Sequence, residues 1–170
     1  QQISILSLPG AFDVAVEVCS LSKMYAMAGW RAGFIAGNDD IVSHVKQYHY
    51  QMGSMITGNV QDAGAAALES DQSCVRELAE RYALRRKIVA GGLRDAGLDV
   101  FDSDGGIYAW VHAPEGSTGG QFADLLLERA SVAALPGTCF GEVGVDYVRF
   151  SLLKSEDQLR EAVRRVTAAL

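Results

Sequence analysis

Apolar residues recur along the chain with two different spacings, and these spacings predict alternating strands and helices. Short apolar runs, typical of strands, cover residues 14–19, 34–37, 99–101, 107–112, 132–135 and 147–152. Apolar residues three or four positions apart, typical of one helix face, recur over residues 41–52, 60–69, 71–96, 122–130 and 159–170. Ser155 and Gln158 match a capping box at the start of the last helix. The pattern predicts an α/β fold.

Two adjacent glycines, Gly91 and Gly92, interrupt the longest helical pattern. Glycine is costly inside a helix, so we expect a kink or a domain joint near this point. Residues 1–90 would then form the end of one domain. Residues 91–170 would form a smaller α/β domain.

Composition and charge narrow the class of protein. The chain is 49% hydrophobic and 21% charged, which is ordinary for a soluble globular protein. A net charge of −6 and a pI near 5.0 argue against a nucleic-acid partner, although a local cationic pocket remains compatible with them. No apolar run approaches the length that spans a membrane, so no membrane partner is expected. Three cysteines without a CxxC pair indicate reduced thiols and a cytoplasmic protein.

Reactive side chains concentrate between the first two predicted strands, in the segment S-L-S-K-M-Y-A-M-A-G-W-R-A-G (20–33). Lys23 follows an apolar strand that we expect to be buried. Partial removal from water favours the neutral amine, which can attack a carbonyl carbon and form a Schiff base. Arg31 offers a planar fork of donors suited to phosphate, and the hydroxyls of Ser20 and Ser22 add further donors.

Two glycines flank the arginine of this segment, and glycine lets a backbone approach a ligand closely. Gly29 and Gly33 are therefore expected to lie against the bound anion. The alternative interpretation is a strand-loop-strand corner, in which Lys23 is merely solvated and Arg31 pairs with an acidic side chain.

The same segment resembles the lysine segment of the fold-type I, pyridoxal-phosphate-dependent aminotransferases of class I/II. Their pattern is Ser-x-Ser-Lys, a loop, and then Gly-x-Arg-x-Gly. The resemblance implies that pyridoxal 5′-phosphate (PLP) is the cofactor and that Lys23 forms the Schiff base with it. It also implies that Ser20 and Arg31 hold the cofactor phosphate and that Ser22 contributes to the same site.

A second arginine, Arg149, lies inside an apolar predicted strand, where it needs a partner to offset the cost of desolvation. One interpretation is an ion pair with Glu142 or Asp146, and the other is that the partner is the substrate. V-R-F-S-L (148–152), following P-G-T-C-F-G (136–141), resembles the family's C-terminal segment. The resemblance implies that Arg149 binds the substrate α-carboxylate through two parallel hydrogen bonds.

A third segment, D-G-G-I-Y-A-W-V (104–111), resembles a strand of the family's small domain. The three segments occur in the family's order and cover nearly the whole chain. They imply the C-terminal portion of the PLP-dependent transferase fold, namely the end of the large mixed-sheet domain plus the small α/β domain. The chain begins with Gln1 rather than Met, and the family's residues that contact the cofactor ring lie upstream of its lysine. We therefore expect a fragment that is inactive alone.

The activity that the resemblance implies is transamination between an amino acid and a 2-oxo acid, in a homodimer. In the family, the loop equivalent to residues 53–59 reaches the neighbouring subunit's cofactor. Thr57 or Asn59 would have this role here, and an ordinary helix–helix connection is the alternative.

Three other functions remain open alternatives. A β-elimination lyase or a synthase of the same fold uses similar residues. The PLP-sensing domain of a transcription regulator keeps the lysine but catalyses no turnover. A cofactor-free α/β domain would use none of these residues for chemistry.

Other charged residues indicate no further site. His44 and His49 lie five positions apart on one predicted helix and so make no metal pair, and no metal is expected. Arg85, Arg86 and Lys87 form the densest basic cluster, which is typical of a solvated helix face.

Overall fold

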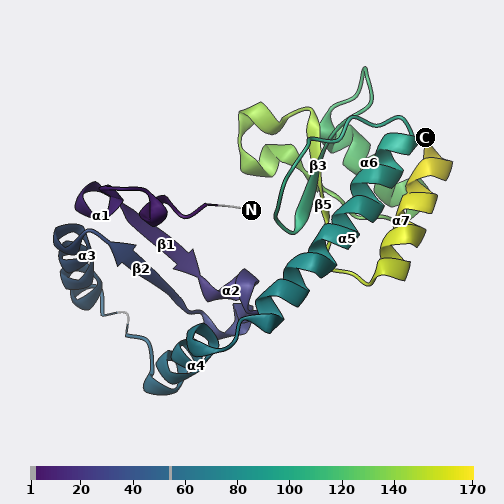
Figure 1. The fold of residues 1–170 in the computed structure, drawn as a ribbon. Helices are drawn as coiled ribbons and strands as arrows, with labels where there is room; N and C mark the ends of the chain where they lie inside the picture. The colour runs from purple at the N-terminus through teal and green to yellow at the C-terminus, as the bar shows by residue number, and fades with distance from the viewer. Residues whose placement is uncertain (1–2, 54) are drawn as a thin grey trace. The chain divides into compact units, whose positions relative to one another are not determined.

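The computed structural model describes residues 3–53 and 55–170 (Figure 1). It divides into two compact units, with the division after Leu78. Helix α5 (Ser73–Asp95) contains this division and continues without a break through Gly91 and Gly92. A Cβ atom at Gly92 would lie 2.5 Å from Cγ1 of Val163, so this glycine makes room for close helix packing. The expected kink at the two glycines is therefore absent.

The first unit contains a two-stranded antiparallel sheet and short flanking helices. Its elements are η1 (Ile5–Ser7), α1 (Ala11–Val14), β1 (Val16–Ser20), α2 (Leu21–Met24), η2 (Ala28–Trp30), β2 (Gly33–Gly37), α3 (Asp39–Gln51) and α4 (Gly58–Glu69). Val18 lies opposite Ile35 in the sheet. The strand expected over 14–19 begins later because Val14 still belongs to α1.

Helix α3 shows how the sequence sets an element boundary in this unit. The Oδ1 atom of Asn38 accepts a hydrogen bond from the backbone N–H of Ile41 at 3.0 Å, which satisfies one of the free donors at the helix start. Asp39 and Asp40 place negative charge in the first turn, where it is favourable. The helices expected over 41–52 and 60–69 are confirmed as α3 and α4.

The second unit is a three-stranded antiparallel sheet with helices packed on one face. Its remaining elements are β3 (Tyr108–His112), α6 (Gly119–Ala130), β4 (Leu135–Pro136), η3 (Gly137–Phe140), η4 (Glu142–Gly144), β5 (Tyr147–Ser151) and α7 (Glu156–Ala169). The strand order is β3-β5-β4. The capping box at Ser155 and Gln158 is formed as expected.

Two predicted strands are shorter in the structure. The segment 99–101 makes only a single bridge, from Val100 to Val111. The segment 132–135 contributes only Leu135 to β4. The backbone N–H of Val132 instead donates to the carbonyl of Leu126 and so closes the end of α6.

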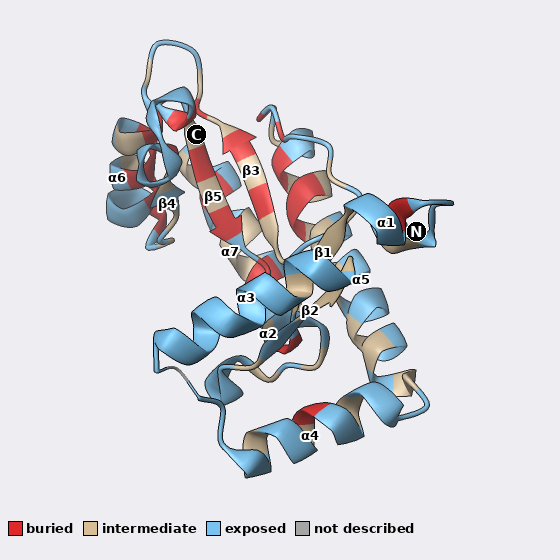
Figure 2. Ribbon diagram, turned by 90° about the vertical axis from the view of Figure 1, so that its left-hand side faces the viewer, coloured by how far each residue is buried: buried red, intermediate tan, exposed pale blue. Residues whose placement is uncertain are grey.

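Alternation along β3 and β5 places the core of the second unit on one side of the sheet. Figure 2 shows this alternation as buried and half-buried bands along both strands. Sixteen buried apolar residues form the core cluster, and they include Ala109, Val111, Val148 and Phe150 from the two strands. Helices α5, α6 and α7 supply other members of that cluster. The opposite sheet face carries Tyr108, Trp110, His112, Tyr147 and Arg149.

Among the helices of the described residues, none is long and apolar enough to cross a membrane.

Candidate active site

Lys23 lies on α2, the short helix that begins directly after β1. The Oγ atom of Ser20 accepts a hydrogen bond from the backbone N–H of Ser22 at 3.2 Å and so caps this helix. Lys23 occupies the last turn, where a cation is favourable, and its side chain is exposed. The chain therefore turns sharply at the strand end and presents the lysine outward.

The expectation of a buried strand before the lysine is wrong within the first unit. Val16 is only half-buried and Val18 is 77% exposed. The physical reason is that a two-stranded sheet, without further strands beside it, shields little of its own surface. Desolvation of Lys23 by this strand therefore has no basis in the packing of the unit.

Arg31 follows the short helix η2 in an uncommon backbone conformation. Its φ of 54° is in the left-handed region, which costs a non-glycine residue about 1–2 kcal/mol. Nη1 donates to the carbonyl oxygen of Ala28 at 3.1 Å, and the side chain is exposed. Strained residues of this kind persist only where the surrounding structure holds them, and they cluster at active sites and ligand-binding sites.

Ser20, Ser22 and Arg31 line one open pocket of about 840 Å³ in the first unit. Lys23, which adjoins Ser22 in the chain, is not among its lining residues. Helix α3 contributes two basic residues to the lining that the sequence did not indicate, Lys46 and His49. From the sequence, His49 is weighed only together with His44 as a metal pair, and Lys46 is part of an amphipathic helix, so no local signal links either position to an anion site.

The donors in this pocket fit a phosphate group. Arg31 uses one hydrogen bond to the backbone, and a guanidinium has five N–H donors. The Ser20 hydroxyl accepts the helix cap with its lone pair, which leaves its own proton to donate. A guanidinium with hydroxyls is the donor set that binds phosphate in proteins. The residues present therefore fit the phosphate end of PLP.

The two glycines of the segment differ in their surroundings. A Cβ atom at Gly33 would lie 2.6 Å from the carbonyl oxygen of Cys19, so Gly33 permits the close approach of β1 and β2. A Cβ atom at Gly29 would meet no protein atom within 4 Å. Gly33 thus permits the close pairing of the two strands and also lines the pocket of Ser20, Ser22 and Arg31, whereas Gly29 is not among the residues that line it.

Arg149 lies on β5, in the second unit, directly opposite Trp110 of β3. Its guanidinium carbon is 3.9 Å from the centroid of the Tyr108 ring and 4.4 Å from that of Phe140. Among the described residues, no carboxylate forms an ion pair with Arg149, so the alternative partners Glu142 and Asp146 are not observed.

No feature of the sequence indicated these two aromatic neighbours. Tyr108 lies two positions from Trp110 on β3 and therefore on the same face of the sheet. Only the register of β3 against β5 brings Tyr108 beside Arg149. Phe140 arrives from η3, outside the two strands that pair. Both contacts are non-local. Hydrophobic alternation assigns a residue to one face of the sheet, but it does not identify which residues of another strand or of η3 lie beside it.

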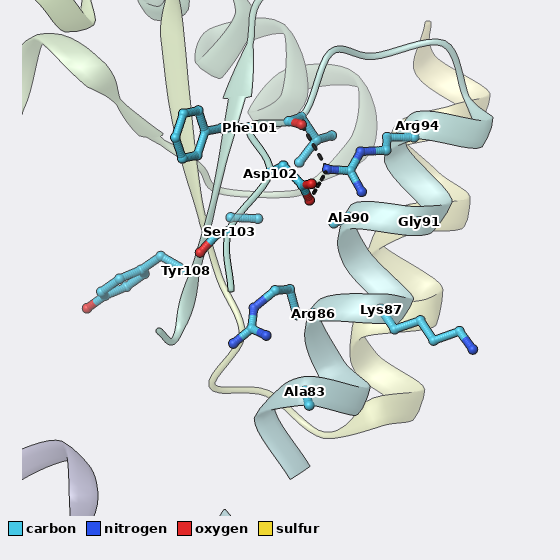
Figure 3. Close-up of a pocket in the computed structure, with 12 residues that line it drawn as sticks. Ala83, Arg86, Lys87, Ala90, Gly91, Arg94, Phe101, Asp102, Ser103 and Tyr108 are labelled. Carbon is cyan, nitrogen blue, oxygen red and sulfur yellow. Dashed lines mark hydrogen bonds and ion pairs between the residues drawn. The ribbon is translucent and has the colours of Figure 1, made fainter. Parts of the chain in front are cut away.

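The basic cluster on α5 is only partly solvated, which corrects the expectation of an exposed face. Nε of Arg85 donates to Oε1 of Glu156 at 2.7 Å, and 13% of the arginine side chain is exposed. Nη2 of Arg86 donates to the carbonyl of Gly106 at 3.1 Å. Figure 3 shows Arg86 turned toward β3 and Lys87 turned away from it. Only Lys87 matches the expected solvated position.

The loop expected to reach a neighbouring subunit is described except for Ser54, which lies outside the described residues. Thr57 precedes α4, and its Oγ1 donates to Oδ1 of Asn59 at 2.6 Å. Both side chains are exposed.

The chain matches a family model described as aminotransferase class I and II, over residues 6–166. The chain belongs to this family. It is 44% identical to the L-glutamine–4-(methylsulfanyl)-2-oxobutanoate aminotransferase of Bacillus subtilis, over 96% of this chain and 41% of the relative. It is also 44% identical to the glutamate-pyruvate aminotransferase AlaC of Escherichia coli, over 97% of this chain and 41% of the relative. The chain thus spans about two fifths of the length of these relatives.

Solved structures agree with this assignment. An aminotransferase from Staphylococcus aureus superimposes with a TM-score of 0.90 at 37% identity, over 97% of this chain and 44% of that one. A Pyrococcus protein described as protein A1 gives a TM-score of 0.90 at 33% identity, over 99% and 44% of the two chains. The mixed α/β structure is therefore a portion of the aminotransferase fold. The names of the relatives give no support to a lyase, a synthase or a transcription regulator.

Proposed function

We propose that the full-length protein containing this chain is a PLP-dependent aminotransferase that exchanges an amino group between an amino acid and a 2-oxo acid. The observation that carries the proposal is the common pocket of Ser20, Ser22 and Arg31, which adjoins the helix of Lys23. An anion-binding set next to a primary amine is what a phosphorylated aldehyde cofactor requires. Relatives over nearly the whole chain are named as aminotransferases, which supports the same reaction.

Each residue of the site has a stated role in this proposal. Arg31, Ser20 and Ser22 bind the phosphate and so fix the cofactor's orientation. Lys23 would hold the cofactor through Nζ in the resting protein. Its amine, once displaced by the substrate amine, would act as the general base that removes the proton from the substrate Cα. PLP, when bound, supplies the electron sink that no amino-acid side chain provides.

Arg149 is proposed to bind the substrate α-carboxylate. In the described residues no carboxylate forms an ion pair with its guanidinium, whose planar fork of donors suits a carboxylate. Pairing through two parallel hydrogen bonds would orient the Cα–H bond as well as add affinity. Amino acids, rather than simple amines, are then the substrate class.

The remaining assignments concern the whole protein. We propose that residues 1–90 belong to the cofactor-binding large domain and residues 91–170 to the small domain. A homodimer, with Thr57 or Asn59 near the partner's cofactor, is supported only by the family resemblance. The cytoplasm is the proposed location, because Cys19, Cys74 and Cys139 are free thiols.

The deciding experiment traps the bond between lysine and cofactor. The chain has four lysines, at positions 23, 46, 87 and 154. Borohydride reduction of the PLP-loaded full-length protein, followed by peptide mass spectrometry, is expected to place the pyridoxyl group on Lys23. Lys23→Ala should abolish this label and lower kcat by at least about 10³-fold, because both the covalent anchor and the proton carrier are lost.

Lys87→Ala is the matched control, since Lys87 is exposed on α5 and lies outside the pocket. This variant should keep both the label and the activity. A pyridoxyl group on any residue other than Lys23 in the wild-type protein would contradict the assignment.

A further inference from the structure

The guanidinium of Arg149 is held by aromatic rings instead of by a carboxylate. Its central carbon lies over the Tyr108 ring at 3.9 Å and over the Phe140 ring at 4.4 Å from the centroids. Both distances are well inside the range of about 6 Å in which a cation is attracted to an aromatic face. Arg149 therefore has two favourable contacts although no ion pair with it is found in residues 3–53 and 55–170.

The ring of Phe140 also contacts a second aromatic ring, that of Trp110. Trp110 meets it edge to face, with centroids 5.6 Å apart and planes at 76°. Trp110 in turn stacks on Tyr147 at 5.4 Å with planes at 15°. These are the two arrangements that aromatic pairs prefer. Phe140, which is 51% exposed, thus packs against Trp110 as well as against Arg149.

Close packing also fixes the segment that carries Phe140. The first residue of η3, Gly137, is buried, and a Cβ atom there would lie 2.9 Å from Cη2 of Trp110. The carbonyl oxygens of Gly144 and Tyr147 are also too close to such an atom, so no larger residue fits without moving the backbone. Phe140 is consequently attached to a short helix that sits directly against the sheet.

A cation–π contact and an ion pair use different parts of a guanidinium. An aromatic ring attracts the flat, charged face, whereas a carboxylate accepts hydrogen bonds from the N–H groups along the edge. Glu142 or Asp146, had either paired with Arg149, would have occupied that edge and neutralised the charge. Rings on the face leave both the edge and the charge available to another carboxylate.

We propose that Tyr108 and Phe140 are positioning residues that hold the plane of the Arg149 guanidinium and leave its N–H edge directed to the substrate carboxylate. The inference rests on the proposed role of Arg149 and deepens it. The rings confine the approach of the carboxylate to the guanidinium plane, which is the geometry of the paired hydrogen bonds. They act through Arg149 and need no contact with the substrate.

The test compares ring removal with ring retention in the PLP-loaded full-length protein. Tyr108→Leu and Phe140→Leu remove one face each. Each should lower kcat/KM for amino acids by about 3- to 30-fold, the range that corresponds to one cation–π contact. Turnover of an amine that lacks the carboxylate should stay unchanged. Tyr108→Phe and Phe140→Tyr keep the face and should restore the selectivity for amino acids.

Phe101→Leu is a matched control for the loss of an aromatic ring in the same unit. Phe101 is 65% exposed, and within the described residues its ring forms no cation–π contact with Arg149. It should change neither substrate's kinetics. If Tyr108→Leu slows amino acids and amines equally, the ring is merely structural and the proposal is overturned.

A spectroscopic readout tests the geometry without turnover. In protein labelled with ¹⁵N-arginine, ring currents should shift the Arg149 side-chain proton signals upfield, and Tyr108→Leu should remove part of that shift. A wild-type signal at the ordinary arginine position would overturn the proposal.

Arg149→Ala, measured in parallel, distinguishes the carboxylate-binding role of Arg149 from the positioning role of the two rings. Equal losses for amino acids and amines in this variant would remove the proposed carboxylate role itself. A loss confined to amino acids, combined with neutral Tyr108→Leu and Phe140→Leu variants, would reject only the positioning role of the rings.

Discussion

The two units differ in how much of their own surface they bury. The second unit has a core of sixteen buried apolar residues, with Leu93, Leu126 and Val148 completely inaccessible. In the described part of the first unit, the buried hydrophobic residues are Ala11 and Leu21. Yet the first unit carries the lysine and the pocket of hydroxyls. The reactive segment thus lies in the part of the chain that is least stabilised by the chain's own packing.

The two units therefore differ in what stabilises them: hydrogen bonds between residues close in sequence in the first unit, and in addition a shared apolar core in the second. In the first unit, order comes from hydrogen bonds at element ends, such as the caps provided by Ser20 and Asn38. In the second unit, the same devices occur together with a continuous apolar interior. Hydrogen bonds at exposed caps contribute about 1 kcal/mol each, whereas burial of one large apolar side chain contributes roughly twice that.

The largest expected effect tests the core of the second unit. Leu126→Ala should lower the free energy of unfolding by about 3–5 kcal/mol, because a fully buried leucine leaves a cavity. Val18→Ala, at a position 77% exposed in the first unit, should change it little. Urea denaturation monitored by circular dichroism measures both. A comparable loss in the two variants would show that Val18 is covered in the protein.

A second prediction compares the two glycines of the reactive segment. Gly33→Ala places a methyl group against the Cys19 carbonyl and should destabilise the β1–β2 pair by about 1–3 kcal/mol. Gly29→Ala meets no protein atom within 4 Å and should leave stability unchanged. Thermal denaturation distinguishes the two. Weaker binding of PLP in folded Gly29→Ala would then indicate that Gly29 lies against the ligand.

The smallest effect concerns the ion pair between α5 and α7 in the second unit. The Arg85 guanidinium donates a hydrogen bond to Glu156 and holds the pKa of that carboxyl below its ordinary value of 4.5. A lowered folded-state pKa adds stability above the unfolded value, and this is lost as the pH falls through the folded value. Glu156→Gln should therefore destabilise the protein at neutral pH, and the deficit should shrink below pH 4.5.

Denaturation midpoints across this pH range measure the change. Glu115→Gln, at an exposed loop position, is the matched control and should follow the wild-type curve. A deficit for Glu156→Gln that is independent of pH would contradict the linkage.

Most elements of the fold followed from the sequence, because their signals are local. The Ser155 cap, the apolar spacing of α7 and the alternation along β5 each depend on residues within a few positions. The same is true of Asn38 at the start of α3. Where the pattern failed, as at 132–134, the end of a neighbouring helix had taken the backbone donor.

The candidate site was only partly predictable, because burial and partners depend on distant segments. The common pocket of Ser20 and Arg31 agrees with their spacing in the sequence. The exposure of Lys23 was not predictable, since an apolar strand is buried only if other layers cover it. The rings beside Arg149 depend on the register between strands and on the fold of η3.

The register of β5 against β3 has a consequence for how accurately the chain folds. A shift by one residue would turn every side chain of β5 to the other face of the sheet. Arg149 would then enter the apolar core in place of Val148, and an unpaired charge there costs several kcal/mol. The shifted pairing is thus disfavoured by the same residue that is proposed to bind the substrate carboxylate. The charge of Arg149 therefore favours the observed register of β5 against β3 even when no ligand is bound.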